Sequence, residues 1–496
     1  MKTTINNTKK KIKGRIFYLG IVVLGMLFTH VSCEKILDTQ SEIAISSSSV
    51  FQTAARIEGL VNGSYKALKG ANLYSGRLLM YGDLRGEEFV IRTENALTGG
   101  YVWEHTTTNL TGDVNELWAQ LYRVINSTNI LIDGLSASTT VLTEEKRQQY
   151  LGEAYFLRAL SYFNLVSFYG RPYADNNGSH PAVPLRLQPE SSSANNDLAR
   201  SSTAEVYAQI IADLDLAEKN LPLTYATPLL NTTRAHRNTA IALKTRIYLN
   251  AQNFDKVKEE AQKIAPQGAA PFQSTTGVTN RLVADIATIF TTNYSSEESI
   301  FSLPMSAEDP PAGSALSNVF LYAPDFVLNS SSNGIISEAS WPEVDRRKSF
   351  VRYDETLRLY LLAKYLKRNP NTDYVPVIRY AEVLLNLAEA EVRSANGSLP
   401  KAISLLKAVR NRSDANYVFP DQRLTSSTIL ETIGKERRIE FLGEGLRSFD
   451  ITRNLLPFPT KPSLSSFTAR QVNPTDEAYV LPLPNGEILT NRLLNN

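Results

Sequence analysis

The stretch RYAEVLLNLAEAEVRSANGSLPKAISLLKAVRNR, residues 379–412, decides the fold class because it predicts two helices joined by a tight turn. Apolar residues recur in its first half with helical spacing: Ala381, Leu384, Leu385, Ala388 and Val392. Such spacing is typical of an amphipathic helix. The pair Asn396-Gly397 tolerates the left-handed backbone that ends helices, and Pro400 suits the first turn of a second helix. Because neither helix can bury its apolar face alone, we expect further helical hairpins to stack on this one.

Several other segments show the same helical periodicity. They are residues 54–68, 117–135, 150–169, 200–222, 239–249 and 254–264. Ser202 and Glu205 form a capping-box pattern at the start of one segment, and YLNAQNFDKV, residues 248–257, resembles a tetratricopeptide turn. These helix pairs predict a mostly α fold, built on tetratricopeptide-like helical hairpins.

Residues 266–373 differ in character, because Ser, Thr, Asn, Gly and Pro are frequent there and helical periodicity fades. Residues 299–303 predict a short strand, and residues 350–365 predict either a hairpin or a helix. We therefore expect a loop-rich region containing little β structure. A long irregular region inside a compact protein is usually functional.

The composition is that of a globular protein with a large core, with 43% hydrophobic and 21% charged residues in 496. The formal net charge is +2, but the first 32 residues hold six basic residues and no acidic one. Without these 32 residues, the chain has 46 basic and 50 acidic residues. A mildly acidic chain with no basic tract is a poor nucleic-acid binder, so we expect no nucleic-acid partner.

The N-terminus has the features of a secretory signal peptide. A basic segment, residues 9–15, precedes an apolar segment, residues 16–29, which is too short to span a bilayer comfortably. Cys33 follows Ser32 and is the only cysteine of the chain, which excludes a disulfide and a cysteine-based metal site. His30-Val31-Ser32-Cys33 resembles a lipobox, although His30 replaces the usual aliphatic residue, so residues 1–32 are a predicted lipoprotein signal peptide and Cys33 a predicted lipidation site.

No motif of the sequence predicts catalysis. The carboxylates between Glu436 and Asp450 alternate with arginines, which keep a carboxylate ionised, so a structural ion-pair network is favoured over a glycosidase acid–base pair. The four histidines lie far apart and match no metal-site spacing. We predict no catalytic residue, no metal site and no cofactor, although an opportunistic calcium site stays open.

Four stretches together resemble the SusD/RagB family of outer-membrane nutrient-binding lipoproteins. They are RYAEVLLNLAEAEVR with LLKAVRNR, the helix at residues 150–169, ERRIEFLGEGLRSFD at residues 436–450, and the terminal LPLPNGEILTNRLLNN. The resemblance runs from about Cys33 to Asn496 and is weakest over residues 266–373. It implies a SusD-like fold, with an N-terminal region, residues 33–230, and a C-terminal region, residues 231–496, sharing one core.

The resemblance also implies a function. Family members are anchored in the outer membrane by lipid, capture oligosaccharides and partner a SusC-like TonB-dependent transporter. Two alternatives stay open at this point: a peptide-binding, RagB-like nutrient lipoprotein, and a tetratricopeptide scaffold that binds a protein.

Candidate ligand-binding residues come from loop aromatics and from the position at which the family's binding loop begins. Sugar sites stack aromatic rings on pyranose faces, while Asp, Asn and Arg bind the hydroxyls. The candidates are Asp83, Arg85, Tyr101, Trp103, Tyr294, Tyr322 and Trp341. Arg346-Arg347-Lys348 is the only modest basic patch and is interpreted as a solvated turn. We therefore expect a neutral glycan that stacks on Trp341 and on one of Tyr101 or Trp103.

Overall fold

The computed structural model describes residues 50–137, 140–291, 294–311, 315–419 and 425–494. The predicted signal peptide and Cys33 lie outside the described residues. Residues Phe51–Asn496 form one compact unit. The predicted division between residues 230 and 231 stays a prediction.

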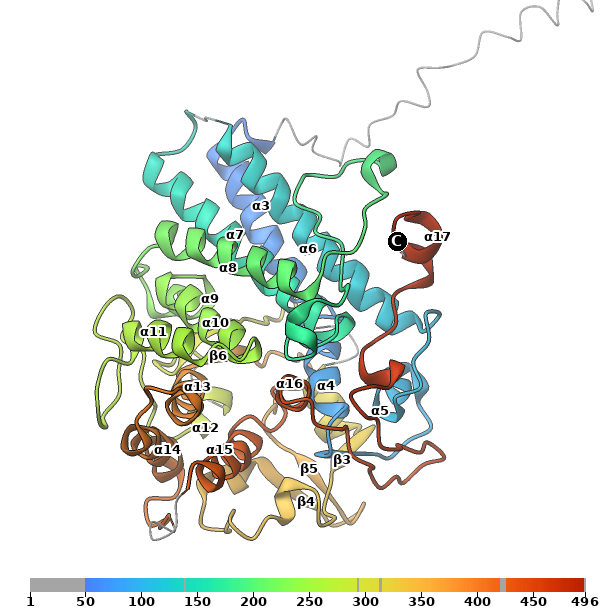
Figure 1. Ribbon diagram of the computed structural model, residues 1–496, viewed down its shortest axis with the longest axis vertical. Helices are drawn as coiled ribbons and strands as arrows, with labels where there is room; N and C mark the ends of the chain where they lie inside the picture. Colours follow the sequence, from blue (N-terminus) through green and yellow to red (C-terminus); the bar gives the residue numbers. More distant parts are fainter. Residues whose placement is uncertain (1–49, 138–139, 292–293, 312–314, 420–424, 495–496) are drawn as a thin grey trace, which may run out of the picture. The chain divides into compact units, whose positions relative to one another are not determined.

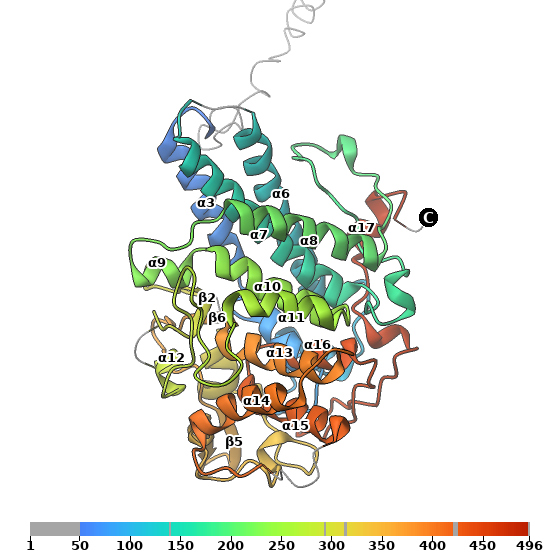
Figure 2. The same cartoon turned by 60° about the vertical axis from the view of Figure 1, so that its left-hand side comes forward.

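Helices are the main regular structure of this unit and its strands are short, which confirms the mostly α fold class. The long helices are α3 (Ala54–Leu68), α6 (Gly112–Ser136), α7 (Glu144–Tyr169), α8 (Thr203–Asn220), α10 (Arg237–Asn250), α11 (Phe254–Ile264), α13 (Tyr380–Arg393), α14 (Leu399–Ser413) and α15 (Ser426–Glu440). Consecutive helices pack pairwise: α6 on α7, α7 on α8, α10 on α11, and α13 on α14. In Figures 1 and 2, α3 and α6 to α8 gather at one end of the unit and α13 to α15 near the other.

The hairpin predicted from residues 379–412 is α13 and α14. All five residues of the predicted apolar face lie in α13, and four of them are fully buried. Ser398 caps α14 by accepting a hydrogen bond from the backbone N–H of Lys401, and Pro400 lies in the first turn. The capping box of Ser202 and Glu205 on α8 is likewise present. Local sequence thus fixes these helix ends, while packing of α13 on α11 and α15 buries the rest.

Strands are short and pair two by two within the described residues. The three antiparallel pairs are β1 (Phe89–Ile91) with β3 (Phe326–Leu328), β2 (Ser299–Leu303) with β6 (Val375–Arg379), and β4 (Val351–Asp354) with β5 (Leu359–Leu362). The strand predicted at residues 299–303 is therefore confirmed, and residues 350–365 contain a hairpin rather than a helix. Tyr353 and Tyr360 lie opposite each other in that hairpin.

Shorter helical segments connect these elements. The short α-helices are α4 (Arg77–Leu84), α5 (Gly100–Glu104), α9 (Pro228–Thr233), α12 (Ala287–Thr291), α16 (Arg447–Arg453) and α17 (Asn485–Thr490). A π-helical turn spans Asn318–Tyr322, and 3-10 turns span Ala96–Thr98, Asn176–Gly178, Ser193–Asn195, Ile335–Ser337, Arg346–Phe350 and Glu477–Tyr479. The extended C-terminal segment after α16 returns to the N-terminal helices, where Leu481 N–H donates to Phe168 O at 2.8 Å.

One large apolar cluster, running from Ile57 to Leu481, joins the helical hairpins to the loop-rich region. A buried ion-pair network also links these two parts. It includes Glu298, Asp345, Arg347, Lys364, Arg379, Arg410, Arg412, Glu436, Glu440 and Glu444. The predicted structural role of the Glu436–Glu444 carboxylates is thus confirmed.

Arg347 corrects one expectation from the sequence. The Arg346-Arg347-Lys348 patch is not a fully solvated turn, because Arg347 is completely buried and forms ion pairs with Asp345, Glu436 and Glu440. These acids hold the pKa of Arg347 well above its usual value although burial alone would lower it. Adjacent basic residues in the sequence therefore do not form one surface patch.

Two absences concern only the part of the chain that the structure describes. No helix there is both long and apolar enough to cross a membrane. No group of three or more His, Cys, Asp or Glu side chains there could hold a metal ion.

Candidate ligand-binding site

Asp83 lies on α4 and points into the protein, not toward a ligand. Its carboxylate accepts hydrogen bonds from the backbone N–H groups of Gly445, at 2.9 Å, and Arg447, at 3.4 Å. Burial raises the pKa of Asp83 to about 7, because the charged form is poorly solvated there. The expectation that Asp83 contacts a ligand is contradicted by its 2% exposure.

Arg85 has a similar interior position at the end of α4. Its guanidinium donates to the carbonyl oxygens of Ala478, at 3.0 Å, and Tyr479, at 2.8 Å, and lies over the ring of Phe458. Burial lowers the pKa of Arg85 to about 10. Arg85 therefore holds the C-terminal segment in place, and it offers a ligand no accessible donor.

Trp103 and Trp341 are also buried, which contradicts their predicted role as stacking platforms. Trp103 is fully buried on α5, donates from Nε1 to Phe89 O at 2.8 Å, and has Lys461 over its ring. Trp341 is 2% exposed, with Lys348 Nζ over its ring at 4.7 Å. Sequence reasoning placed both in loops, where exposure is common, but both rings belong to the core.

Tyr101 is the one candidate aromatic residue that is exposed, with 44% of its surface accessible. The stretch around it is not a loop as expected, because residues 100–104 form the short helix α5. Its ring packs edge-on against Phe467, with ring centroids 6.1 Å apart. Packing thus fixes the orientation of the ring while 44% of the residue stays accessible, and an exposed, oriented ring suits stacking on a flat ligand.

Tyr101 borders an open surface cavity of about 650 Å³, which we call the Tyr101 cavity. Its walls are Arg77, Ala96, Leu97, Tyr101, Thr106, Thr108, Leu110, Thr111, Gly112, Asp113 and Glu116. Leu97 and Leu110 are 77% and 71% exposed. The cavity therefore combines an aromatic ring and two aliphatic side chains with hydroxyl, carboxylate and guanidinium groups.

Internal hydrogen bonds fix the polar groups of the Tyr101 cavity. Arg77 Nη2 donates to Leu97 O at 3.0 Å, and a second hydrogen bond joins Arg77 to Asn72. The hydroxyl of Tyr81, on the next turn of α4, donates to Asp113. Burial and the adjacent Asp113 carboxylate raise the pKa of Tyr81, so this hydroxyl keeps its proton and orients the carboxylate. The cavity is thus preorganised, which limits the entropy lost on binding.

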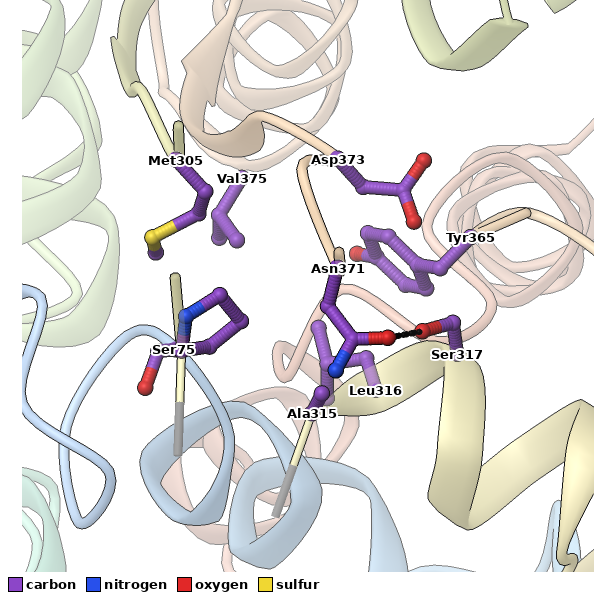
Figure 3. Close-up of a pocket in the computed structure, with 10 residues that line it drawn as sticks. Ser75, Met305, Ala315, Leu316, Ser317, Tyr365, Asn371, Asp373 and Val375 are labelled. Carbon is purple, nitrogen blue, oxygen red and sulfur yellow. Dashed lines mark hydrogen bonds between the residues drawn. The ribbon is translucent and has the colours of Figure 1, made fainter. Parts of the chain in front are cut away.

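A second hollow includes Ser75, which lies two residues before α4, and Figure 3 shows it in close-up. Its walls are Ser75, Met305, Pro311, Ala315, Leu316, Ser317, Tyr365, Asn371, Asp373 and Val375. The enclosed space is only about 10 Å³, the size of one water molecule. The hydroxyl of Ser75 is buried there without a protein partner, and a single water would satisfy it. This hollow is too small for a sugar ring.

Tyr294 and Tyr322, the two remaining candidates, are half-buried and engaged with protein groups. Tyr294 stacks on Tyr374, with centroids 4.4 Å apart, and its hydroxyl donates to Asp373 at 3.4 Å. The hydroxyl of Tyr322 donates to Leu366 O at 2.6 Å, and Arg368 lies over its ring. Neither borders the Tyr101 cavity. A ligand role for these two side chains stays a prediction.

Sequence reasoning missed most of the residues that line the Tyr101 cavity. Arg77 and Asp113 lie in the first turns of two helices, and Leu97 and Leu110 lie in short connections, so no shared spacing links them. The one available signal was the run of Thr and Gly around Tyr101, which predicted an irregular surface but not its partners. Tertiary contact between segments far apart in the sequence assembles the cavity, as with Tyr81 and Asp113, which are 32 residues apart.

Comparison with known proteins gives a consistent picture. One family model, described as "Starch-binding associating with outer membrane", matches residues 35–249, and the model "SusD family" matches residues 351–496. The chain is 26% identical to SusD-like protein P2 of Formosa agariphila, over 95% of this chain and 97% of that protein.

Solved structures are also similar. A SusD superfamily protein from Bacteroides fragilis superimposes with a TM-score of 0.81 at 30% identity, covering 90% of this chain and 100% of that one. A laminarin binding SusD-like protein superimposes with a TM-score of 0.66 at 21% identity, over 89% and 98% of the two chains. The second likeness concerns the fold alone.

Proposed function

The chain belongs to the SusD superfamily of outer-membrane-associated carbohydrate-binding proteins, and on that premise we propose that it captures a neutral oligosaccharide in the Tyr101 cavity. Members of this superfamily bind substrates without catalysis, and the chain is not an enzyme. The observation that carries the proposal is Tyr101, a 44% exposed residue at the border of a cavity of about 650 Å³ with a polar lining.

The lining of the Tyr101 cavity supports a neutral sugar. Tyr101 offers a face for stacking on the C–H surface of a pyranose, and Leu97 and Leu110 extend this apolar contact. Arg77 is the one basic residue of the lining, against the two acidic residues Asp113 and Glu116. Because an acidic glycan needs a surplus of basic groups, this balance favours an uncharged ligand whose hydroxyls bond to the threonines and carboxylates.

Isothermal titration against a panel of oligosaccharides and short peptides tests this proposal. We expect binding to at least one neutral glycan and none to charged peptides of similar length. Binding to peptides alone would contradict the glycan proposal and support a RagB-like peptide carrier.

We further propose that the mature protein is anchored in the outer membrane through acyl chains on Cys33. Two or more acyl chains on one residue are enough for stable anchoring. Metabolic labelling with palmitate should mark the wild type and leave Cys33→Ala unlabelled. Equal labelling of both proteins would contradict the anchor.

The partner that we propose is a SusC-like TonB-dependent transporter, to which the captured oligosaccharide passes. This step rests on family membership. Co-purification from detergent-solubilised membranes tests it. A large outer-membrane protein should accompany the wild type, and recovery of only soluble partners would favour a tetratricopeptide scaffold instead.

A further inference from the structure

An uncharged segment with exposed leucines connects α8 to α10. Residues 221–233, LPLTYATPLLNTT, contain no charged side chain. Leu223, Leu229 and Leu230 are 42%, 45% and 38% exposed, and the residues Thr224 and Ala226 to Pro228 between them are exposed as well. We call residues 223–230 the leucine loop. A contiguous exposed apolar surface usually marks a contact with a protein or a membrane.

The leucine loop is held in a defined conformation. The backbone N–H of Tyr225 donates to Asn231 Oδ1 at 2.6 Å, which closes the loop, and the Tyr225 hydroxyl donates to Ala235 O at 2.7 Å. Thr227 caps α9 by accepting from the backbone N–H of Leu230. The leucines are therefore displayed by an ordered turn. Figure 2 shows α9 at the left-hand edge of the view.

The leucine loop lies close to α3, the helix that follows the predicted lipid-bearing segment. Arg234, at the end of α9, hydrogen-bonds Asn62 of α3, and the N–H of Ala235 donates to the Tyr65 hydroxyl at 3.0 Å. Ala54 begins α3 eight residues before Asn62, which corresponds to roughly 12 Å along the helix axis. The residues that directly follow the leucine loop thus contact the helix that leads back along the chain toward Cys33.

The length of the segment between Cys33 and α3 limits how far the leucine loop can be from the membrane. Residues 33–49 are 17 in number, and 17 residues reach at most about 60 Å when fully extended. Resting on the anchor proposed above, this distance keeps the leucine loop within reach of the bilayer. A protein partner could bind the leucine loop at any distance from the bilayer, whereas a lipid contact requires the loop to lie near the bilayer.

We propose that the leucine loop inserts into the outer leaflet as a second membrane contact beside the lipid anchor. Its occupant is the acyl-chain layer just below the headgroups. Because residues 221–233 carry no charge, the contact should depend on apolar burial rather than on anionic lipid.

Flotation of a chain of residues 34–496 with phosphatidylcholine vesicles tests this proposal without the anchor. The buried apolar clusters of the described residues all lie within residues 57–481, so this chain keeps the whole core. We expect the wild type to float with the vesicles and the variant Leu229→Asp/Leu230→Asp to float about tenfold less, which is on the order of the effect of one fully buried leucine. Flotation of the wild type should not decrease in 1 M salt, because an apolar contact is not screened. Leu464→Asp, which alters a 52% exposed leucine elsewhere, is the matched control and should float like the wild type.

Other outcomes would overturn the proposal. If wild-type residues 34–496 stay unbound, or if the double aspartate variant floats equally well while its thermal midpoint is unchanged, the loop is not a membrane contact. Concentration-dependent sedimentation that is lost in the same variant, without flotation, would assign the loop to self-association. Palmitate labelling of Cys33 and glycan titration report on the anchor and the Tyr101 cavity separately, so failure of either is distinguishable from failure of this proposal.

Discussion

Asp83 shows how strongly the surroundings of a single side chain set its behaviour. In the folded protein its pKa is raised from 3.8 to about 7 by burial. Between these values the folded state holds a proton that the unfolded state has released. The contribution of Asp83 to the free energy of unfolding therefore falls as the pH rises from 4 to 7, and is constant above pH 7.

Replacing Asp83 with Asn should remove this pH dependence. We expect the stability of Asp83→Asn relative to the wild type to rise by about 2 to 4 kcal/mol between pH 4 and pH 7. Urea denaturation at several pH values measures it. A pH-independent difference would mean that the Asp83 carboxyl has an ordinary pKa in the folded protein.

The pKa of Asp450 is shifted in the opposite direction to that of Asp83. Burial alone would raise the pKa of Asp450, but the charges of Arg437 and Arg453 lower this pKa to about 2. Its stabilising effect is present above pH 4 and is lost as the pH falls toward 2. In the same denaturation series, Asp450→Asn should cost about 2 kcal/mol at pH 7 and less at pH 2. An equal cost at both pH values would contradict the ion-pair assignment.

At this scale, the sequence shows which side chains could stack on a sugar, but it does not show which of them are exposed. Tyr101 and Trp103 are two residues apart, and both looked equally suited to stacking on a sugar. The helix α5 turns Tyr101 outward and Trp103 into the core, where its Nε1 meets Phe89 O. Whether a side chain faces solvent depends on contacts with distant segments, and local spacing in a short helix does not reveal them.

At the scale of elements, replacing two helical glycines with alanine should have opposite effects on stability. A Cβ on Gly82 of α4 would lie 2.0 Å from Gly445 O, whereas a Cβ on Gly63 of α3 would meet nothing within 4 Å. Gly445 has a positive φ of 76°, so the turn beside α4 cannot easily shift to make room. The contact between α4 and the turn before α16 therefore requires glycine on both sides.

Thermal denaturation of the two alanine variants tests this contrast. Gly63→Ala should stabilise the protein by up to about 1 kcal/mol, because alanine favours an exposed helix position. Gly82→Ala should destabilise it by roughly 1 to 3 kcal/mol through overpacking. Equal effects of the two substitutions would contradict the close approach of α4 to Gly445.

The buried ion-pair network gives a second prediction for elements. Arg347 joins the turn before β4 to α15 through Glu436 and Glu440. Arg347→Met leaves these buried carboxylates with fewer partners, so we expect a loss of about 3 to 5 kcal/mol in the free energy of unfolding. Arg281→Ala breaks an exposed pair with Glu297 and should change stability by less than about 1 kcal/mol. Similar losses for both variants would contradict the structural role of the network.

Long periodic helices were predictable from the sequence because their apolar spacing and caps are local. The α13–α14 hairpin and the capping box on α8 are examples. The three strand pairs were only partly predictable. Residues 351–362 form a hairpin because Tyr353 and Tyr360 face each other across it, a contact that weak alternation in the sequence left ambiguous.

At the scale of the whole molecule, the apolar cluster from Ile57 to Leu481 spans both predicted regions. We therefore expect residues 34–496 to unfold in a single cooperative transition. Differential scanning calorimetry compares the calorimetric and van't Hoff enthalpies, which should agree. Two separable transitions, with a protease-resistant fragment ending near residue 230, would contradict a shared core.

The membership of the whole chain in its family was predictable from several separated motifs, whereas the identity of its ligand was not. The motifs Glu436–Asp450 and residues 379–412 form the buried network and the hairpin, which maintain the fold. The Tyr101 cavity is built instead from short connections such as those that hold Leu97 and Leu110. Such segments can change without harming the core, so they carry no recognisable pattern.

The central claim is that the Tyr101 cavity binds a neutral glycan, and titration of one binding glycan into matched tyrosine variants tests it most directly. Tyr101 and Tyr353 are 44% and 43% exposed, but only Tyr101 borders the cavity. We predict that Tyr101→Ala weakens binding about 10-fold or more, through the loss of a stacked ring and its buried area, while Tyr353→Ala leaves the affinity unchanged. Unchanged affinity in Tyr101→Ala, or an equal loss in both variants, would contradict the claim.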